Sequence, residues 1–140
     1  MTGLHEEQAA LVKKSFIRIL PHRDAFSKSL YDRLFTVAPE ARSLFTSDIE
    51  RQREKLVATL AFVVNGASDL DKLSGEVRAL GRRHKDYGVE FGHYAILRNV
   101  LVDTLAEYLG DDFTPDVQAA WASLYDELAE AMTNPDNPSR

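Results

Sequence analysis

Apolar residues recur along most of this chain at the spacing of an α-helix, and no stretch alternates between apolar and polar positions as a strand would. The first helix is predicted from Leu4 to Ile19. Pro21 cannot donate the next helical hydrogen bond, so this helix should end before it. Its predicted core face is Leu4, Leu11, Val12, Phe16 and Ile19.

The next segment continues the helical pattern, with a short turn in the middle. A second helix is predicted over residues 24–37, with Asp24 as its N-cap. Pro39 opens a short helical turn that ends at Phe45. A third helix is expected from about Ile49 to Ala67.

The second half of the chain begins less regularly. Residues 70–87 have a helical pattern that three glycines are expected to interrupt: Gly75, Gly81 and Gly88. A helix over 91–109 should be stopped by Gly110. Thr114-Pro115-Asp116 is a strong start signal, with a capping threonine, a proline at the first helical position and an acid in the first turn. The helix that it opens should end near Met132.

These segments predict an all-α protein of six to eight helices. One domain is expected over residues 1–133, followed by a disordered polar tail over 134–140. An up-and-down bundle is possible. The turn after Pro39 and the broken segment before His84 favour a crossed-helix packing.

Composition narrows the classes of function. With 140 residues, the chain suits one compact domain, and its formal net charge of −5 argues against a nucleic-acid or anionic-membrane partner. There is no cysteine, which excludes disulfides, thiolate ligands and haem attachment through C-x-x-C-H. The acidic start lacks a signal pattern, and the longest apolar stretch, 56–64, is far short of the ~20 residues that span a bilayer. A soluble cytoplasmic protein is therefore expected.

One pair of residues suggests chemistry. His84 lies near the end of a predicted helix, and Gln52 lies at the start of another. Two helices that present these side chains to one apolar slot could hold a flat, metal-centred cofactor, because an imidazole can supply one axial bond to haem iron. The alternative is a solvated histidine on a polar helix.

A series of short segments runs through the chain: Leu30–Phe35, Pro39-Glu40, Leu44-Phe45, Gln52–Leu56, Gly81–Lys85, Tyr87–Val89, His93-Tyr94 and Ala120-Trp121. In combination they resemble the bacterial globin family, and most of all single-domain haemoglobins related to the haem domain of flavohaemoglobins. The resemblance implies a globin-like fold, haem b as cofactor, and O2, NO and CO as ligands.

The resemblance also implies roles for single residues. His84 is then the proximal iron ligand, and Phe45 packs on the haem plane. A solvated charge is an equal alternative for Lys55, which could otherwise pair with a haem propionate. The implied cofactor contacts are His84, Phe45, Leu56, Lys55, Val89 and Tyr94, and the residues that face the ligand are Tyr31 and Gln52.

Elementary geometry agrees with several of these roles. Gln52 and Leu56 recur at helical spacing with Thr59, Leu60 and Val63, so one face of their helix can cover a cofactor. The Leu80 carbonyl, four residues before His84, lies within reach of the imidazole nitrogen that does not bind iron. By resemblance, Tyr94 matches a tyrosine that flavohaemoglobins place on this side. Their partner glutamate would fall on Asp136, in the tail, so a strong electron push toward the iron is not expected.

Three functions remain open. The first is a globin that binds O2 reversibly for storage or transport. The second is an NO dioxygenase, which converts NO and O2 to nitrate and would need an external reductase, since no G-x-G-x-x-G motif or reductase half is found. The third is a helical structural or signalling domain without haem. The sequence does not decide the oligomeric state.

Overall fold

Every regular element of the protein is helical in the part that the computed structural model describes, residues 4–45, 48–86 and 91–133. No strand occurs in these ranges, which confirms the all-α prediction. Within the described ranges, six α-helices and four short 3-10 helices follow one another as α1 (Glu6–Ile19), η1 (Leu20–His22), α2 (Arg23–Val37), η2 (Pro39–Leu44), α3 (Ile49–Asn65), η3 (Leu70–Leu73), α4 (Ser74–Asp86), α5 (Phe91–Leu109), η4 (Gly110–Asp112) and α6 (Pro115–Thr133).

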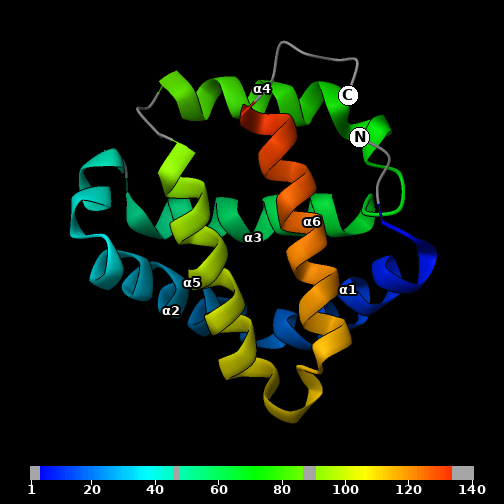
Figure 1. Cartoon of the computed structure of the whole chain (residues 1–140). Helices are drawn as coiled ribbons and strands as arrows, with labels where there is room; N and C mark the ends of the chain where they lie inside the picture. The colour runs from blue at the N-terminus through cyan, green and yellow to red at the C-terminus, as the bar shows by residue number, and fades with distance from the viewer. Residues whose placement is uncertain (1–3, 46–47, 87–90, 134–140) are drawn as a thin grey trace.

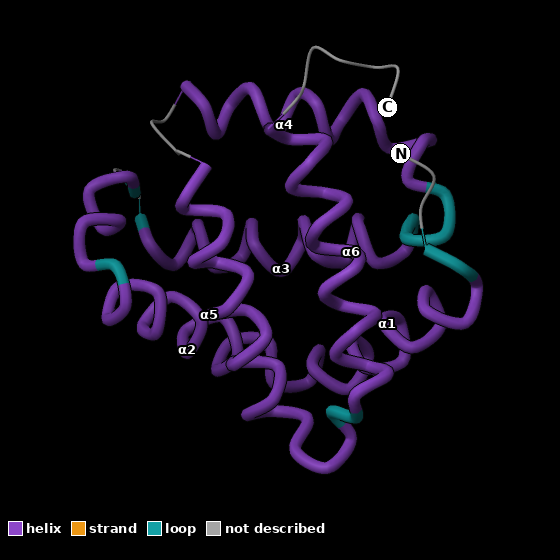
Figure 2. Tube along the Cα trace, in the orientation of Figure 1, coloured by secondary structure: helices purple, strands orange, loops and turns teal. Residues whose placement is uncertain are grey.

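The helices cross one another, as predicted, and do not form an up-and-down bundle (Figures 1 and 2). In the view of Figure 1, α4 spans the top, α3 runs across the middle, and α5 and α6 descend through the view. Helix α2 packs against α3 and α5, while α6 packs against α1, α4 and α5. Helix α6 thus contacts helices that lie far apart in the sequence and holds them together.

The core lies between these crossings. The predicted face of α1 is confirmed: Val12, Phe16 and Ile19 are buried, and Leu11 is half-buried. Leu4 is also buried, although it precedes α1, and its N–H donates to the Ala67 carbonyl at 2.9 Å. The largest fully buried side chains are Trp121, Phe26, Ile19, Leu30, Leu70 and Leu105.

One helix start and one helix end follow the sequence signals, and a second helix start is capped by a carboxylate. The Asp48 carboxylate accepts from the Glu50 N–H at 3.0 Å and caps α3. The Thr114 hydroxyl accepts from the Val117 N–H at 3.3 Å, which confirms the predicted start of α6. Gly110 follows α5 with a φ of +54°, a left-handed conformation that glycine adopts without strain.

The prediction of Asp24 as an N-cap is wrong. Pro21 ends α1 as expected, but η1 continues directly into α2 through His22, so no extended residue stands at position 24. Helix α2 begins at Arg23, and Asp24 lies inside its first turn.

The predicted interruption at Gly81 is also wrong, because α4 continues through it. Near Gly75 the segment does change, since η3 ends at Leu73 and α4 begins at Ser74. Gly88 lies outside the described residues. At Gly81 the glycine serves packing: a Cβ built there would lie 2.7 Å from the Cα of Met132, near the end of α6. The absent side chain therefore allows two helix backbones to approach closely.

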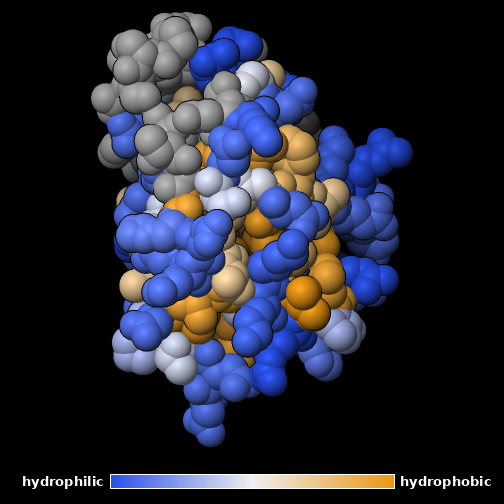
Figure 3. Space-filling view, turned by 90° about the vertical axis from the view of Figure 1, so that its right-hand side faces the viewer, coloured by the Kyte–Doolittle hydropathy of each residue, from blue (hydrophilic) through white to orange (hydrophobic). Residues whose placement is uncertain are grey.

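On the face seen in Figure 3, apolar side chains gather toward the middle, with polar side chains on both sides. Among the described residues, the large exposed apolar side chains are Ile17, Val37 and Phe62, on three different helices. Of the helices in the described ranges, none is both long enough and apolar enough to cross a bilayer.

Candidate functional site

Three aromatic rings surround the predicted ligand side of the site. Tyr31 of α2 is 8% exposed, and its ring meets that of Phe45 edge to face, with centroids 5.4 Å apart and planes at 86°. Phe35 is the third ring of the group, and its centroid lies 5.9 Å from that of Tyr31 and 5.6 Å from that of Phe45. Such edge-to-face pairs stabilise a fixed arrangement of rings. The structure therefore brings Tyr31 and Phe45 together, although they belong to different elements.

The Tyr31 phenol is a neutral donor. Its burial raises its pKa to about 12, because a phenolate would lose its hydration in this apolar environment. At physiological pH the hydroxyl therefore keeps its proton and can donate it in a hydrogen bond.

Gln52 and Leu56 lie one turn apart on α3, and both are half-buried. The Asp48 cap sets where this helix begins and hence where Gln52 stands. Thr59 and Leu60 are half-buried and Val63 is buried, so the predicted face of α3 turns away from solvent.

His84 of α4 is half-buried and has a defined tautomer. Its Nδ1 lies 2.8 Å from the Leu80 carbonyl oxygen, which confirms the predicted contact. Because a carbonyl can only accept, Nδ1 carries the proton and Nε2 keeps a lone pair. Burial lowers the pKa of His84, the Leu80 bond opposes that change, and the positive charge of Arg83 adds to it. The result is a neutral imidazole with one nitrogen available to a metal.

Tyr94 of α5 stands beside His84, with ring centroids 6.5 Å apart and planes at 31°. It is half-buried, and burial raises its pKa. The Tyr125 hydroxyl of α6 donates to the Tyr94 carbonyl at 2.6 Å and so joins α6 to the first turn of α5. Asp136, the counterpart of the flavohaemoglobin glutamate, lies outside the described residues.

The described residues suit a haem group. Haem iron needs a neutral imidazole nitrogen, which His84 offers at Nε2. A flat apolar macrocycle needs apolar side chains that the protein does not cover completely. The elements around the site supply such side chains, all of them half-buried: Phe45, Leu56, Leu60, Ile96 and Leu97.

Two further predicted cofactor contacts are Lys55 and Val89. Lys55 is exposed on α3, a position that suits both a solvated charge and a partner for a haem propionate. Val89 lies outside the described residues. The site residues thus form two groups, one with Tyr31 and Phe45 and one with His84 and Tyr94, with Gln52 and Leu56 on α3.

Sequence reasoning missed three residues that support the site. Phe35 is four residues after Tyr31, a helical spacing that could have indicated their contact. Arg53, next to Gln52, binds α2 through its guanidinium group. Tyr125 holds the Tyr94 carbonyl. The last two contacts depend on helix crossings, which no local pattern reveals.

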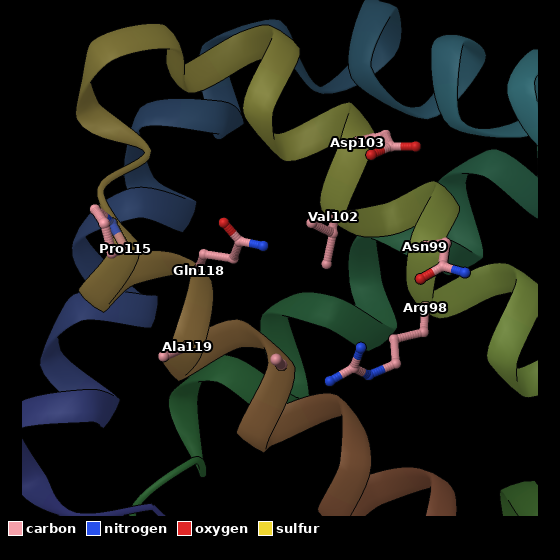
Figure 4. A pocket seen from close by; sticks show the side chains of 8 residues that line it. Arg98, Asn99, Val102, Asp103, Pro115, Gln118 and Ala119 are labelled. Carbon is pink, nitrogen blue, oxygen red and sulfur yellow. The ribbon is translucent and has the colours of Figure 1, made fainter.

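A separate groove opens between α5 and α6 (Figure 4). It shares no residue with the predicted site. Arg98 at its edge is already paired with the Asp126 carboxylate of α6 through two hydrogen bonds of 2.8 and 3.1 Å. The groove is lined by Arg98, Asn99, Val102, Asp103, Pro115, Gln118, Ala119 and Ala122.

The family model named Globin matches residues 28–132. Among curated proteins, the chain is 26% identical to a flavohaemoprotein of Bacillus subtilis and 30% identical to one of Bordetella pertussis, each over 132 residues. These matches cover 92% of this chain and 33% of each relative, so the chain spans about a third of their length. It is 24% identical to the anaerobic nitrite reductase NSHB5 of Oryza sativa subsp. indica, covering 93% of this chain and 94% of that protein.

A solved structure supports the same grouping. An engineered carbene transferase from Rhodothermus marinus, provisionally described as a nitric oxide dioxygenase, superposes with a TM-score of 0.82. The two chains are 32% identical, and the match covers 93% of this chain and 91% of the other. The resemblance of the short segments and the crossed-helix fold are both confirmed.

Proposed function

Because the chain belongs to the globin family, we propose that it is a haem-b protein that binds O2 reversibly, for storage or transport. Haem, when bound, supplies an iron with one open coordination position for O2, NO or CO. His84 would hold the iron through Nε2, and the Leu80 carbonyl would keep the imidazole ring in orientation.

One observation carries this proposal: a buried, protonated phenol held against Phe45. Tyr31 cannot turn freely, because Phe35 and Phe45 contact its ring. Burial keeps its proton in place. Bound O2 has partial negative charge on its outer atom, so a phenol directed at it makes a charge-assisted hydrogen bond. Gln52 would supply a second polar group from α3, while Phe45 and Leu56 would exclude water.

The test is the rate of O2 release from Tyr31→Phe. Hydrogen bonds to charged groups contribute about 1.5–3 kcal/mol, and 1.4 kcal/mol corresponds to a factor of ten. We therefore expect O2 to dissociate roughly ten- to a hundredfold faster from Tyr31→Phe than from the wild type, measured by stopped-flow displacement with CO. The CO dissociation rate, which depends less on such a bond, serves as the internal control. An O2 rate that stays within a factor of two would refute the role of Tyr31.

A second candidate function is NO dioxygenation with an external reductase. The relatives favour it: they include flavohaemoproteins and a structure provisionally described as a nitric oxide dioxygenase. The same Tyr31 and Gln52 would serve this reaction, since O2 must be held firmly while NO arrives. Nitrate measurement after mixing the O2-loaded protein with NO distinguishes the two functions. One nitrate per haem without turnover favours the binding protein, and repeated turnover with cellular reductant favours the enzyme.

A further inference from the structure

The relative position of Tyr31 and Gln52 depends on how α2 and α3 pack, because the two side chains come from different helices. A polar contact between these helices lies close to both residues. Arg53 follows Gln52 directly in α3, and its guanidinium group reaches across to α2.

The Arg53 guanidinium group binds two acceptors on α2, Ser27 and Asp24, and this pair of hydrogen bonds forms a fork. Its Nε donates to the Ser27 hydroxyl oxygen at 3.2 Å, and its Nη2 donates to the Asp24 carbonyl at 2.8 Å. Ser27 in turn donates to the same Asp24 carbonyl at 3.1 Å. A planar guanidinium that engages two acceptors fixes orientation as well as distance.

The burial of Ser27 makes this contact specific. Ser27 is 2% exposed, and Arg53 is half-buried. Ser27 lies four residues before Tyr31, one helical turn along the same side of α2. The fork therefore fastens α3 to α2 one residue from Gln52 and one turn from Tyr31.

We propose, on the basis of the function above, that Arg53 is a positioning residue that sets the distance between the Tyr31 hydroxyl and the Gln52 amide by joining α3 to α2 through Ser27 and Asp24. Arg53 acts through these neighbours and does not itself touch the ligand. Loss of the fork lets the start of α3 move relative to α2, so the two polar groups no longer converge on bound O2.

The chain offers a matched control for this role. Arg51 belongs to the same turn of α3 but is exposed on its surface. Arg53→Met and Arg51→Met remove the same charge and retain a similar apolar stem. A general effect of charge would appear in both variants, whereas an effect of the fork appears in Arg53→Met alone.

The experiment measures O2 dissociation and the C–O stretching frequency of the CO-bound protein. We expect Arg53→Met to release O2 about three- to tenfold faster, a partial loss of the bonds that Tyr31→Phe removes. Its C–O frequency should move toward that of Tyr31→Phe, since this frequency reports the field of nearby donors. Arg51→Met should match the wild type in both readouts.

Combination with Tyr31→Phe shows whether Arg53 acts through the phenol. In the Tyr31→Phe background, the effect of Arg53→Met should shrink, because the group that it positions is absent. Ser27→Ala provides a second variant that keeps Arg53 and removes one acceptor, and it should produce a smaller change in the same direction. This variant tests the proposal even if Arg53→Met folds poorly.

Separate outcomes judge the two proposals. Equal rates and frequencies in Arg53→Met and Arg51→Met, beside a large effect of Tyr31→Phe, would overturn the positioning role and leave the function intact. A full Arg53→Met effect in the Tyr31→Phe background would also overturn it. A wild-type chain that takes up no haem would refute the function itself, and the positioning role with it.

Discussion

The buried hydroxyl of Ser15 joins the first and the last α-helix of the described chain. It lies in α1 and is 5% exposed, and it accepts a hydrogen bond of 2.8 Å from the indole N–H of Trp121 in α6. The Ser15 hydroxyl also donates to the carbonyl oxygens of Leu11 and Val12, which lie 2.8 and 2.9 Å from Oγ. The hydroxyl thus satisfies a buried donor that would otherwise have no acceptor.

We expect Ser15→Ala to lower the free energy of unfolding by about 1–3 kcal/mol, because the Trp121 N–H stays buried and loses its partner. Urea unfolding followed by tryptophan fluorescence measures this change, since Trp121 is the only tryptophan. Ser43→Ala is the control: Ser43 is exposed and bonds only to the Glu40 carbonyl at 2.9 Å, so little change is expected. Equal losses in the two variants would contradict the assignment.

Sequence reasoning succeeded with residues whose role is local or repeated. The Leu80 partner of His84 follows from helix geometry alone, and Thr114 follows from capping chemistry. It failed where the role depends on a residue far along the chain. No sequence pattern near Ser15 predicts its contact with Trp121, and none near Arg53 predicts its contact with Ser27, because these contacts form only where helices cross.

At the scale of elements, α4 shows how a local rule can mislead. Glycine disfavours helix, so Gly75 and Gly81 suggested breaks. Helix α4 begins at Ser74, directly before Gly75, and it continues through Gly81. The surroundings of the two glycines differ: nothing lies within 4 Å of a Cβ at Gly75, whereas a Cβ at Gly81 would meet the backbone of Met132. Gly81 therefore allows the contact between α4 and α6, and Gly75 makes no such contact.

The two glycines therefore make opposite predictions. Gly75→Ala should raise the free energy of unfolding only slightly, by about 0.5 kcal/mol or less, because Gly75 lies in the first turn of α4 and the cost of glycine applies in full only to a helix interior. Gly81→Ala should lower it by roughly 1–3 kcal/mol, because a backbone neighbour cannot move aside as a side chain can. Urea titration of both variants provides the measurement. Stabilisation by Gly81→Ala would contradict the close approach of the α4 backbone to Met132 of α6.

At the scale of the whole molecule, the packing of helices buries Tyr31 and leaves Tyr94 and Tyr125 half-buried. Burial raises the pKa of Tyr31 to about 12, and it is also the main cause of the raised pKa values of Tyr94 and Tyr125. A tyrosine in an unfolded chain has a pKa of about 10. The folded chain therefore holds protons that the unfolded chain releases at lower pH.

This difference predicts the response of the protein to alkali. Because the folded pKa is the higher one, the stability from these phenols is fully present below about pH 10. It is lost as the pH rises toward 12, the folded pKa of Tyr31. We expect the urea midpoint to fall across that window and tyrosinate absorbance to rise together with the loss of helical circular dichroism. The urea midpoint of Tyr31→Phe should fall less across this pH range, because the variant lacks the phenol with the raised pKa. Ionisation of all five tyrosines near pH 10 with the helices intact would contradict the prediction.

The position of α6 in the fold has a consequence for synthesis. This helix packs against both α1 and α4, yet the ribosome makes it after either of them. The helix with His84 is thus translated before the surface that it rests on exists. A nascent chain must keep the apolar faces of α1 and α4 from other partners until residues 115–133 emerge.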